Sequence, residues 1–444
     1  MNIWILTEEK PKVSVTRQLL SIFCNDFGGI IDRSDLISIT PSIHNNVFEF
    51  QYIVTGIKLH DIDNIIIKIV SGSSSFMDFL FFLQENAPTE GSTLDNLIFA
   101  TEETKTSDDE SRNTGVYQRC SKFVFIKSYY NVPLYMLYND EASVREEKKP
   151  SDTSIFGTNL LLTIGVKIIG KLIDSWFYPF NTIQEIIEFK TRMRRPPGNN
   201  IPIEIHMISR SLITISGRLD KPQNIGKIAH DPNIGALSII AYSLRYLGWQ
   251  GEIVITRHGV TQNYIDNTNG KNKFLYIAGI VNISLAGLNL PVRAEMPDNY
   301  WHYEMKSEKM ASILFHVLCE NRGFIEVYQN HAGCERGYFK TRDCELITLP
   351  KKTPAGENLL IPDVIVRDES NKVIILIEGK KLDTISAGLA ELKGYDDIER
   401  LYIQPYFPGY TVYRRLTIFG GHATTLPHPK VLFYLSEDGR IINH

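Results

Sequence analysis

The sequence is short of several features that would each mark a particular class of protein. It has 5 cysteines among 444 residues, an odd number at scattered positions, which excludes a disulfide framework and favours a reducing compartment. Basic residues do not outnumber acidic ones, since 47 Lys and Arg face 51 Asp and Glu for a net charge of -4. This balance excludes a generally basic coat for nucleic acids, so any such surface has to be local.

Long hydrophobic runs and targeting signals are also missing. The most apolar window, 156–180, is interrupted by Lys167, Lys171 and Asp174, so it predicts a buried helix and not a membrane span. The first residues lack the basic stretch and cleavage site of a secretory signal. We therefore expect a cytoplasmic protein without membrane contact, and the length predicts two or three domains.

The most informative stretch that is present runs from Leu359 to Lys381. An apolar run ends at Val366, a polar turn covers 368–371, and a second apolar run covers 373–377. This is the pattern of a β-hairpin. Apolar residues occupy both faces of the second run, which predicts a strand that is buried on both sides.

Three charged residues fall at the open end of this hairpin. Asp363 and Glu378 are equally far from the centre of the turn, so a regular hairpin sets them opposite each other, roughly 5 Å apart. Lys380 follows Glu378 by two positions and shares its face. Adjacent carboxylates repel each other in apolar surroundings, and a hard divalent cation such as Mg²⁺ relieves the repulsion. The alternative is an ordinary surface hairpin with a lysine–carboxylate pair across its strands.

The segment Pro362-Asp363 followed by Glu378-Gly379-Lys380 resembles the PD-(D/E)xK nuclease superfamily, which includes most type II restriction endonucleases. A helical pattern over 384–395 and a strand pattern over 411–419 follow, in the order of that family's strand–strand–helix–strand core. The resemblance implies Mg²⁺-dependent hydrolysis of phosphodiester bonds. It assigns Asp363 and Glu378 to the metal, and Lys380 to the attacking water or the developing charge.

The first third of the chain contains a similar arrangement. Apolar runs at 76–83 and 97–105 flank a loop over 85–96, and Asp78 and Glu103 are equally far from a point inside that loop. We therefore predict a second hairpin in which Asp78 faces Glu103.

Lys105 completes this second set, because it follows Glu103 by two positions and shares its face. The resemblance implies the same metal-binding and charge-neutralising roles for Asp78, Glu103 and Lys105, although Met77 stands where the family has proline. Glu102 is expected on the opposite face, in an ion pair or a supporting position.

Basic and amide side chains outside these hairpins are candidates for DNA contact, because Lys and Arg bind phosphates while Arg and Asn read base edges. Some lie in the helix predicted to run to Phe123, and others lie in the central region before Pro196-Pro197-Gly198 and after the strand at 253–255. Solvated helix ends and loops have the same composition, which is the alternative. The candidates are Arg112, Asn113, Arg119, Lys190, Arg192, Arg194, Arg195 and Arg257.

A set of His and Cys residues has the composition of a structural zinc site. The alternative is a set of ordinary buried residues, because the first pair falls in the helix predicted over 310–319. The set comprises His316, Cys319, His331, Cys334 and Cys344.

Taken together, these features predict an α/β protein with mixed-sheet, restriction-endonuclease-like cores. The cores are expected at 1–150 and 346–444, with a central α+β DNA-recognition region at 151–345 entered through a charged linker near 140–152. The expected function is a sequence-specific endonuclease of the restriction type that acts on double-stranded DNA, as a monomer or homodimer, beside a cognate methyltransferase. The alternatives are a repair or recombination nuclease, and a DNA-binding protein whose nuclease fold has lost its chemistry.

Overall fold

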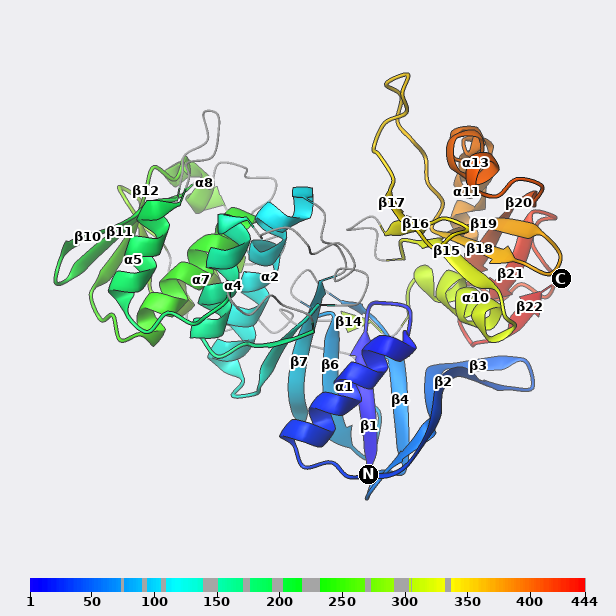
Figure 1. The fold of residues 1–444 in the computed structure, drawn as a ribbon, viewed down its shortest axis with the longest axis horizontal. Coiled ribbons are helices and arrows are strands. Elements are labelled where there is room, and N and C mark those ends of the chain that lie inside the picture. The colour runs from blue at the N-terminus through cyan, green and yellow to red at the C-terminus, as the bar shows by residue number, and fades with distance from the viewer. Residues whose placement is uncertain are drawn as a thin grey trace. The chain divides into compact units, whose positions relative to one another are not determined.

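The computed structural model describes residues 1–72, 76–89, 94–104, 109–138, 151–170, 176–193, 203–217, 232–267, 273–290, 303–304, 306–331 and 337–443. It is a mixed α/β structure with several sheets (Figure 1). Two compact units divide the chain. Unit 1 comprises Met1–Ser71, Phe82–Glu90 and Glu304–His444, and unit 2 comprises Gly72–Phe81 and Gly91–Tyr303. Unit 1 thus combines both ends of the chain, and its bounds differ from the three predicted segments.

The amino-terminal strands of unit 1 form one sheet in the order β2-β3-β4-β1. The next strand, β6, contains the boundary between the units, and its last residues, 82–84, belong to unit 1. Strands β2, β3 and β4 are antiparallel, whereas β1 is parallel to β4. Helix α1 has no side-chain cap, and its apolar side chains are buried. The elements are β1 Asn2–Thr7, α1 Val13–Asp26, β2 Ile31–His44, β3 Val47–Leu59 and β4 Asn64–Ile69.

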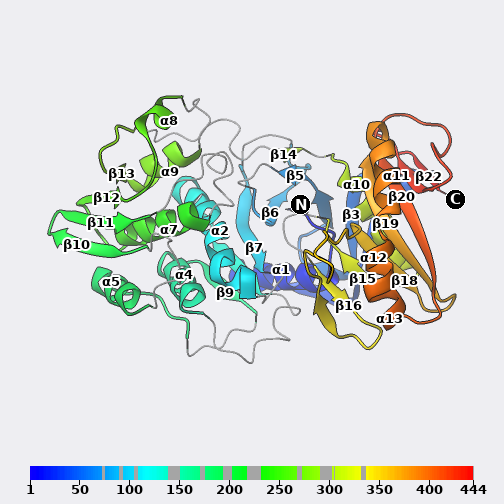
Figure 2. The ribbon, with the colours of Figure 1, turned by 90° about the horizontal axis from the view of Figure 1, so that it is seen from above.

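The carboxy-terminal part of unit 1 contains a six-stranded mixed sheet in the order β15-β18-β19-β20-β21-β22. Helices α10 and α11 both contact its central strands, as Figure 2 shows for α11 along β19 and β20. The elements are α10 Lys309–Asn321, β15 Ile325–Gln329, β16 Tyr338–Lys340, β17 Leu346–Thr348, β18 Val364–Asp368, β19 Val373–Lys381, α11 Ile385–Lys393, α12 Asp396–Ile398, α13 Gln404–Tyr406, β20 Thr411–Phe419, β21 Val431–Leu435 and β22 Ile441–Asn443.

The predicted hairpin at the centre of this sheet is confirmed. Strands β18 and β19 pair antiparallel with Val364 opposite Ile377 and Asp368 opposite Val373, which is the register expected from the position of the turn. The hairpin is buried on both faces. One face packs with α10 through Val364, Val366, Ile377 and Cys319, and the other belongs to the larger core cluster that includes Ile365, Leu376, Leu392 and Leu416.

Unit 2 contains the start of β6 followed by β7, β8 and β9, and a separate four-stranded sheet in the order β10-β11-β12-β13. Strands β7, β8 and β9 are parallel, with helices in the connections. The elements are β6 Phe79–Gln84, β7 Leu97–Thr104, α2 Asp109–Tyr129, β8 Leu134–Tyr138, α4 Asp152–Thr163, β9 Lys167–Ile169, α5 Ile183–Arg192, β10 Ile205–Ser209, β11 Leu212–Ser216, α7 Pro232–Tyr246, β12 Glu252–Thr256, α8 Gln262–Asn267, α9 Lys273–Val281 and β13 Ser284–Leu285. Two further short strands, β5 Ser71–Gly72 and β14 Tyr303–Glu304, pair with each other.

The prediction of a single buried helix over 156–180 is wrong. Helix α4 ends at Thr163, and Gly165 has a φ of +84°, a left-handed conformation that stops a helix and that glycine adopts without strain. The chain then enters the short strand β9. The apolar residues are therefore shared between a buried helix and a short strand at the edge of the sheet, which composition alone does not separate.

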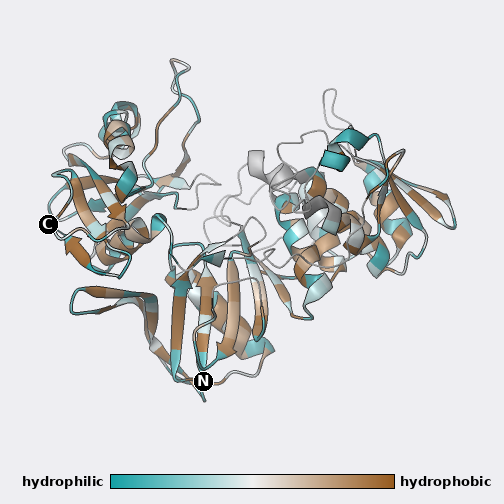
Figure 3. Ribbon diagram, turned by 180° about the vertical axis from the view of Figure 1, so that it is seen from behind, coloured by the Kyte–Doolittle hydropathy of each residue, from teal (hydrophilic) through white to brown (hydrophobic). Residues whose placement is uncertain are grey.

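Apolar residues concentrate along the strands and inner helix faces of both units, whereas the connecting loops are more polar (Figure 3). None of the described helices is long and apolar enough to cross a membrane.

The burial of the hairpin predicts how stability responds to substitution. Leu376 is fully buried in β19, so Leu376→Ala should lower the free energy of unfolding by about 2–5 kcal/mol, because it removes apolar contacts and leaves a cavity. Leu360, which is 45% exposed just before the hairpin, provides the matched control. Urea unfolding followed by tryptophan fluorescence measures both, and equal losses in the two variants would contradict the described packing.

Candidate active site

The hairpin places two acidic residues opposite each other. Asp363 immediately precedes β18, and continuing the register from the Val364–Ile377 pair brings it opposite Glu378. Side chains alternate along a strand, so Asp363, Glu378 and Lys380 share the face that carries Ile365 and Leu376. Helix α11 covers that face. The structure therefore brings these three residues together, as the sequence predicts.

Hydrogen bonds tie these side chains into one network. The backbone N–H of Gly379 donates to Oδ2 of Asp363 at 2.9 Å. The Lys380 ammonium donates to Oε1 of Glu378 at 2.7 Å and pairs with Oε2 of Glu391 at 2.8 Å. The Tyr395 hydroxyl donates to the other oxygen of Glu378. These five residues, Asp363, Glu378, Lys380, Glu391 and Tyr395, are called the carboxy-terminal cluster below.

Two glycines allow this close approach. A Cβ on Gly379 would lie 3.1 Å from Oγ of Ser312 and 3.2 Å from Oδ2 of Asp363. A Cβ on Gly388 of α11 would lie 2.8 Å from the Cγ atom of Lys380. The small residues therefore let the helix and the aspartate sit directly against the strand that carries Glu378 and Lys380.

Burial changes the acidity of both central carboxyls. Desolvation raises the pKa of Asp363 to about 6, although the hydrogen bond from Gly379 and the charge of Lys380 act in the opposite direction. Desolvation, followed by the nearby charge of Asp363, raises the pKa of Glu378 to about 8. Neither buried carboxyl therefore loses its proton readily, and a bound cation would make ionisation more favourable.

Sequence reasoning missed Glu391 and Tyr395. Both lie on or just after α11, and the spacing from Gly388 to Glu391 and Tyr395 keeps all three on one side of a helix. That spacing was the available signal. The sequence prediction considered only the apolar residues of this helix, which face the sheet core.

Unit 2 contains a second set of acidic residues, and here the structure differs in detail from the prediction. Asp78 immediately precedes β6, and its Oδ2 accepts a hydrogen bond from the backbone N–H of Glu103 at 2.7 Å. The backbone N–H of Asp78 donates to Oε1 of Glu102 at 3.1 Å. The carboxylate beside Asp78 is therefore that of Glu102 and not that of Glu103. The ion pair predicted for Glu102 is present, since Lys122 and Arg119 both contact its carboxylate.

Helix α2 supplies two cations to Glu102. The Lys122 ammonium donates to Oε1 of Glu102 at 2.9 Å, and Nε of Arg119 lies 3.7 Å from its Oε2. Desolvation, followed by the charge of Asp78, raises the pKa of Glu102 to about 7 while Lys122 and Arg119 lower it. Asp78, Glu102, Arg119 and Lys122 are called the amino-terminal cluster below.

Of the predicted partners Glu103 and Lys105, the structure describes only the first. Glu103 is buried and reaches Asp78 through its backbone, and its predicted metal-binding role stays a prediction. Lys105 lies outside the described residues.

The predicted DNA-contacting residues separate into different environments. Arg119 is buried against Glu102, and the Lys190 ammonium lies 5.5 Å from the centre of the Phe156 ring, where burial lowers its pKa. Arg192 and Arg257 are exposed, and Arg257 has a left-handed φ of +54°. Arg194 and Arg195, and the side chains of Arg112 and Asn113, lie outside the described residues.

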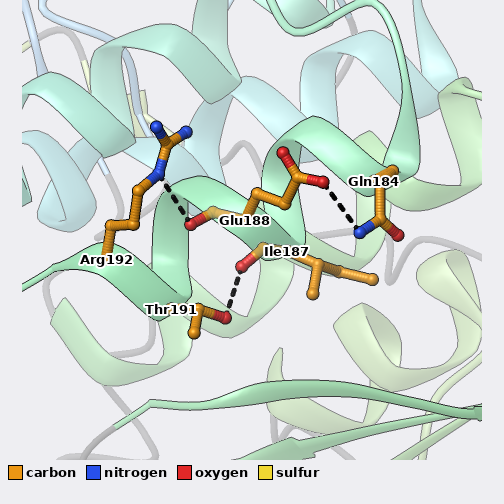
Figure 4. Close-up of a pocket in the computed structure, with 5 residues that line it drawn as sticks. All are labelled: Gln184, Ile187, Glu188, Thr191 and Arg192. Carbon is orange, nitrogen blue, oxygen red and sulfur yellow. Dashed lines mark hydrogen bonds between the residues drawn. The ribbon is translucent and has the colours of Figure 1, made fainter.

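A shallow pocket of about 470 Å³ lies beside Arg192. All its lining residues belong to α5: Gln184, Ile187, Glu188, Thr191 and Arg192 (Figure 4). Arg192 donates from Nε to the backbone carbonyl of Glu188 at 3.2 Å. Because side chains of a single helix form this pocket, it does not bring together groups from different elements, as a catalytic site requires.

The His and Cys residues considered for zinc are divided between different surroundings. His316 and His331 contact each other through Nδ1 and Nε2 at 3.1 Å, whereas Cys319 packs with apolar residues and burial raises the pKa of its thiol to about 12. Cys334 lies outside the described residues, and Cys344 is exposed.

Nε2 of His316 faces the carboxylates of Glu320 and Glu326 instead. The Lys10 ammonium already bridges these two carboxylates. This group therefore has a resident cation from the protein itself.

The raised pKa of Glu378 predicts an unusual dependence of stability on pH. Between the ordinary pKa of a glutamate and about 8, the metal-free folded protein keeps a proton that the unfolded chain has released, so stability falls as the pH rises through this range. Glu378→Gln removes this titration and should raise Tm relative to the unsubstituted protein, by about 3 °C or more at pH 9, with a smaller difference at pH 5. Thermal unfolding in the presence of a chelator measures the effect.

The control is Glu369→Gln in the turn of the same hairpin, where the hydrogen bond from Tyr410 lowers the pKa of the carboxyl. That variant should show no gain in Tm that grows with pH. A constant difference for Glu378→Gln across the pH range would contradict the prediction.

The carboxy-terminal cluster brings buried oxygen ligands and an ammonium together from a hairpin and the helix that follows it. The amino-terminal cluster brings similar groups together in unit 2. No family model, curated protein or solved structure matches this chain.

Proposed function

We propose that this chain is a Mg²⁺-dependent endonuclease that hydrolyses phosphodiester bonds of double-stranded DNA at the carboxy-terminal cluster. The observation that carries the proposal is the position of Asp363 and Glu378. Two buried carboxyls lie opposite each other across a hairpin, both with a raised pKa, and Lys380 is on the same face. The elements follow in the order hairpin, helix and parallel strand, which is the order that the resemblance to PD-(D/E)xK nucleases implies.

The donor set suits a hard divalent cation. Asp363 and Glu378 offer carboxylate oxygens, and Mg²⁺ prefers oxygen ligands together with water and phosphate. Among the described residues, the hydrogen bond from Gly379 occupies only Oδ2 of Asp363. Oδ1 of Asp363 is therefore available to a metal ion. When bound there, Mg²⁺ would polarise the scissile phosphate and acidify an attacking water.

Residues of the carboxy-terminal cluster would neutralise charge on the phosphate and keep Glu378 and Lys380 in a fixed orientation. Burial acts to lower the pKa of Lys380, but hydrogen bonds to Glu378 and Glu391 outweigh it and raise the pKa, so the side chain stays a cation. This ammonium would neutralise charge that develops on the phosphate oxygens. Tyr395 fixes the orientation of Glu378, and Glu391 fixes that of Lys380.

In the proposed reaction, the oxygen of water bonds to phosphorus while the bond from phosphorus to the 3′-oxygen breaks. The water gives its proton to solvent, and the leaving oxygen takes one up. The products are a 5′-phosphate and a 3′-hydroxyl.

We extend the proposal to sequence-specific cleavage of the restriction type. The support is the size of unit 2, which is far larger than a hairpin and helix need, and the exposure of Arg192 and Arg257 there. A partner methyltransferase would protect the host's own sites. A repair nuclease would instead cut only damaged or branched DNA, and a protein that has lost its chemistry would retard DNA in a gel without cutting it.

Substitution of the lysine tests the proposal directly. Lys380→Ala should slow the Mg²⁺-dependent formation of linear product from a plasmid by about 100-fold, because the charge that stabilises the transition state is lost. Lys381→Ala is the matched control, since this exposed neighbour points to the other face and should cut at the unsubstituted rate. Equal rates of linear-product formation for Lys380→Ala and the unsubstituted protein would exclude a catalytic role for this cluster.

Metal binding should also release protons. Because Asp363 and Glu378 have pKa values of about 6 and about 8 without metal, Mg²⁺ has to displace protons below pH 8, and its affinity should rise from pH 6 to pH 8. Calorimetric titration in two buffers of different ionisation enthalpy counts the released protons. An affinity that stays constant over this pH range would argue against these ligands.

A further inference from the structure

The two clusters share a local arrangement even though their sequence spacings differ. In each, an aspartate immediately precedes a strand, and its Oδ2 accepts a hydrogen bond from the backbone N–H of the residue that follows a buried glutamate. The distances are 2.9 Å from Gly379 to Asp363 and 2.7 Å from Glu103 to Asp78. This correspondence pairs Glu102, and not Glu103, with Glu378.

A lysine also contacts the corresponding glutamate oxygen in each cluster. Lys380 donates to Oε1 of Glu378 at 2.7 Å, and Lys122 donates to Oε1 of Glu102 at 2.9 Å. Lys380 comes from the strand itself, two residues after its glutamate. The equivalent position after Glu102 is Thr104, which carries no charge, so Lys122 of α2 supplies the cation from the following helix.

The surrounding elements correspond as well. Helix α11 lies between β19 and β20, which pair parallel, and α2 lies between β7 and β8, which also pair parallel. Each helix therefore crosses from the strand with the glutamate to the next strand of the same sheet, and each brings side chains to that glutamate. An ion pair that served only to neutralise Glu102 would need no second carboxylate, yet Asp78 lies beside it.

We propose that Asp78, Glu102 and Lys122 form a second Mg²⁺-binding centre in unit 2 that hydrolyses a DNA phosphodiester bond, with its lysine supplied by helix α2. The proposal rests on the proposed function and assigns one centre to each strand of the duplex. The reaction is the same hydrolysis, in which water adds to phosphorus and the 3′-oxygen leaves with a proton.

The charges around the two centres differ. The carboxy-terminal cluster adds a third carboxylate, Glu391, whereas the amino-terminal cluster adds a second cation, Arg119. A divalent cation is attracted less strongly where the carboxylates are already neutralised. The second centre therefore binds its metal more weakly than the first, and a nicked plasmid should accumulate at low Mg²⁺ before linear product forms.

Counting bound Mn²⁺ and following plasmid cleavage test this in the full chain. The unsubstituted protein should bind two equivalents of Mn²⁺ by electron paramagnetic resonance and linearise a plasmid that carries one recognition site. Glu102→Gln and Glu378→Gln should each bind one equivalent and only nick the plasmid, and the double variant should do neither. Lys122→Ala should only nick, whereas Lys127→Ala, on the same helix, should linearise.

Different failures separate the two proposals. If Glu378→Gln abolishes all cleavage while Glu102→Gln and Lys122→Ala linearise normally and Glu102→Gln keeps two equivalents of Mn²⁺, the second centre is overturned and the proposed function stands. If the unsubstituted protein cuts no DNA, both fall. Should Lys122→Ala fail to fold, Glu102→Gln preserves side-chain size and carries the same test, with thermal unfolding as the check on folding.

Discussion

Two buried carboxyls that face each other across a hairpin are the constraint on which the rest of this site depends. Burial raises the pKa of Asp363 and Glu378, and the charge of Asp363 raises that of Glu378 further, so the ionised pair is costly without a partner. The backbone N–H of Gly379, the ammonium of Lys380 and the hydroxyl of Tyr395 offset part of that cost. The remaining cost is what would make a divalent cation bind here, since its charge stabilises both ionised carboxylates at once.

The two clusters show that one arrangement of strands can place a lysine beside a buried glutamate from two different elements. In the carboxy-terminal cluster the cation follows the glutamate along the same strand, while in the amino-terminal cluster it arrives from the next helix. Both solutions work because a helix that crosses to a parallel strand has to pack over the strand it has just left. A long side chain on that helix, such as lysine, can therefore reach the carboxylate below it.

A third buried group of charged residues in the chain is not a candidate metal site. The buried group of Glu320, Glu326 and His316 is already neutralised by the ammonium groups of Lys10 and Lys340. Its histidine has a pKa well below the usual value because burial disfavours the charged ring. The carboxy-terminal cluster differs from it in having three carboxylates, those of Asp363, Glu378 and Glu391, around the single ammonium of Lys380. The excess of carboxylates over cations, and not burial alone, is what makes the carboxy-terminal cluster favour an added metal.

The sequence by itself determined the hairpin, its register and the meeting of Asp363, Glu378 and Lys380, because a turn at 368–371 between apolar runs allows only one regular pairing. The helix and strand that follow were equally clear from their periodicity. Only the tertiary structure decided that Glu391 and Tyr395 belong to the same cluster, and that Glu102 with Lys122 lies beside Asp78. The physical reason is distance along the chain: strand alternation predicts which residues of a hairpin share a face, but the crossing of a helix over a strand depends on packing between elements, which sequence spacing does not record.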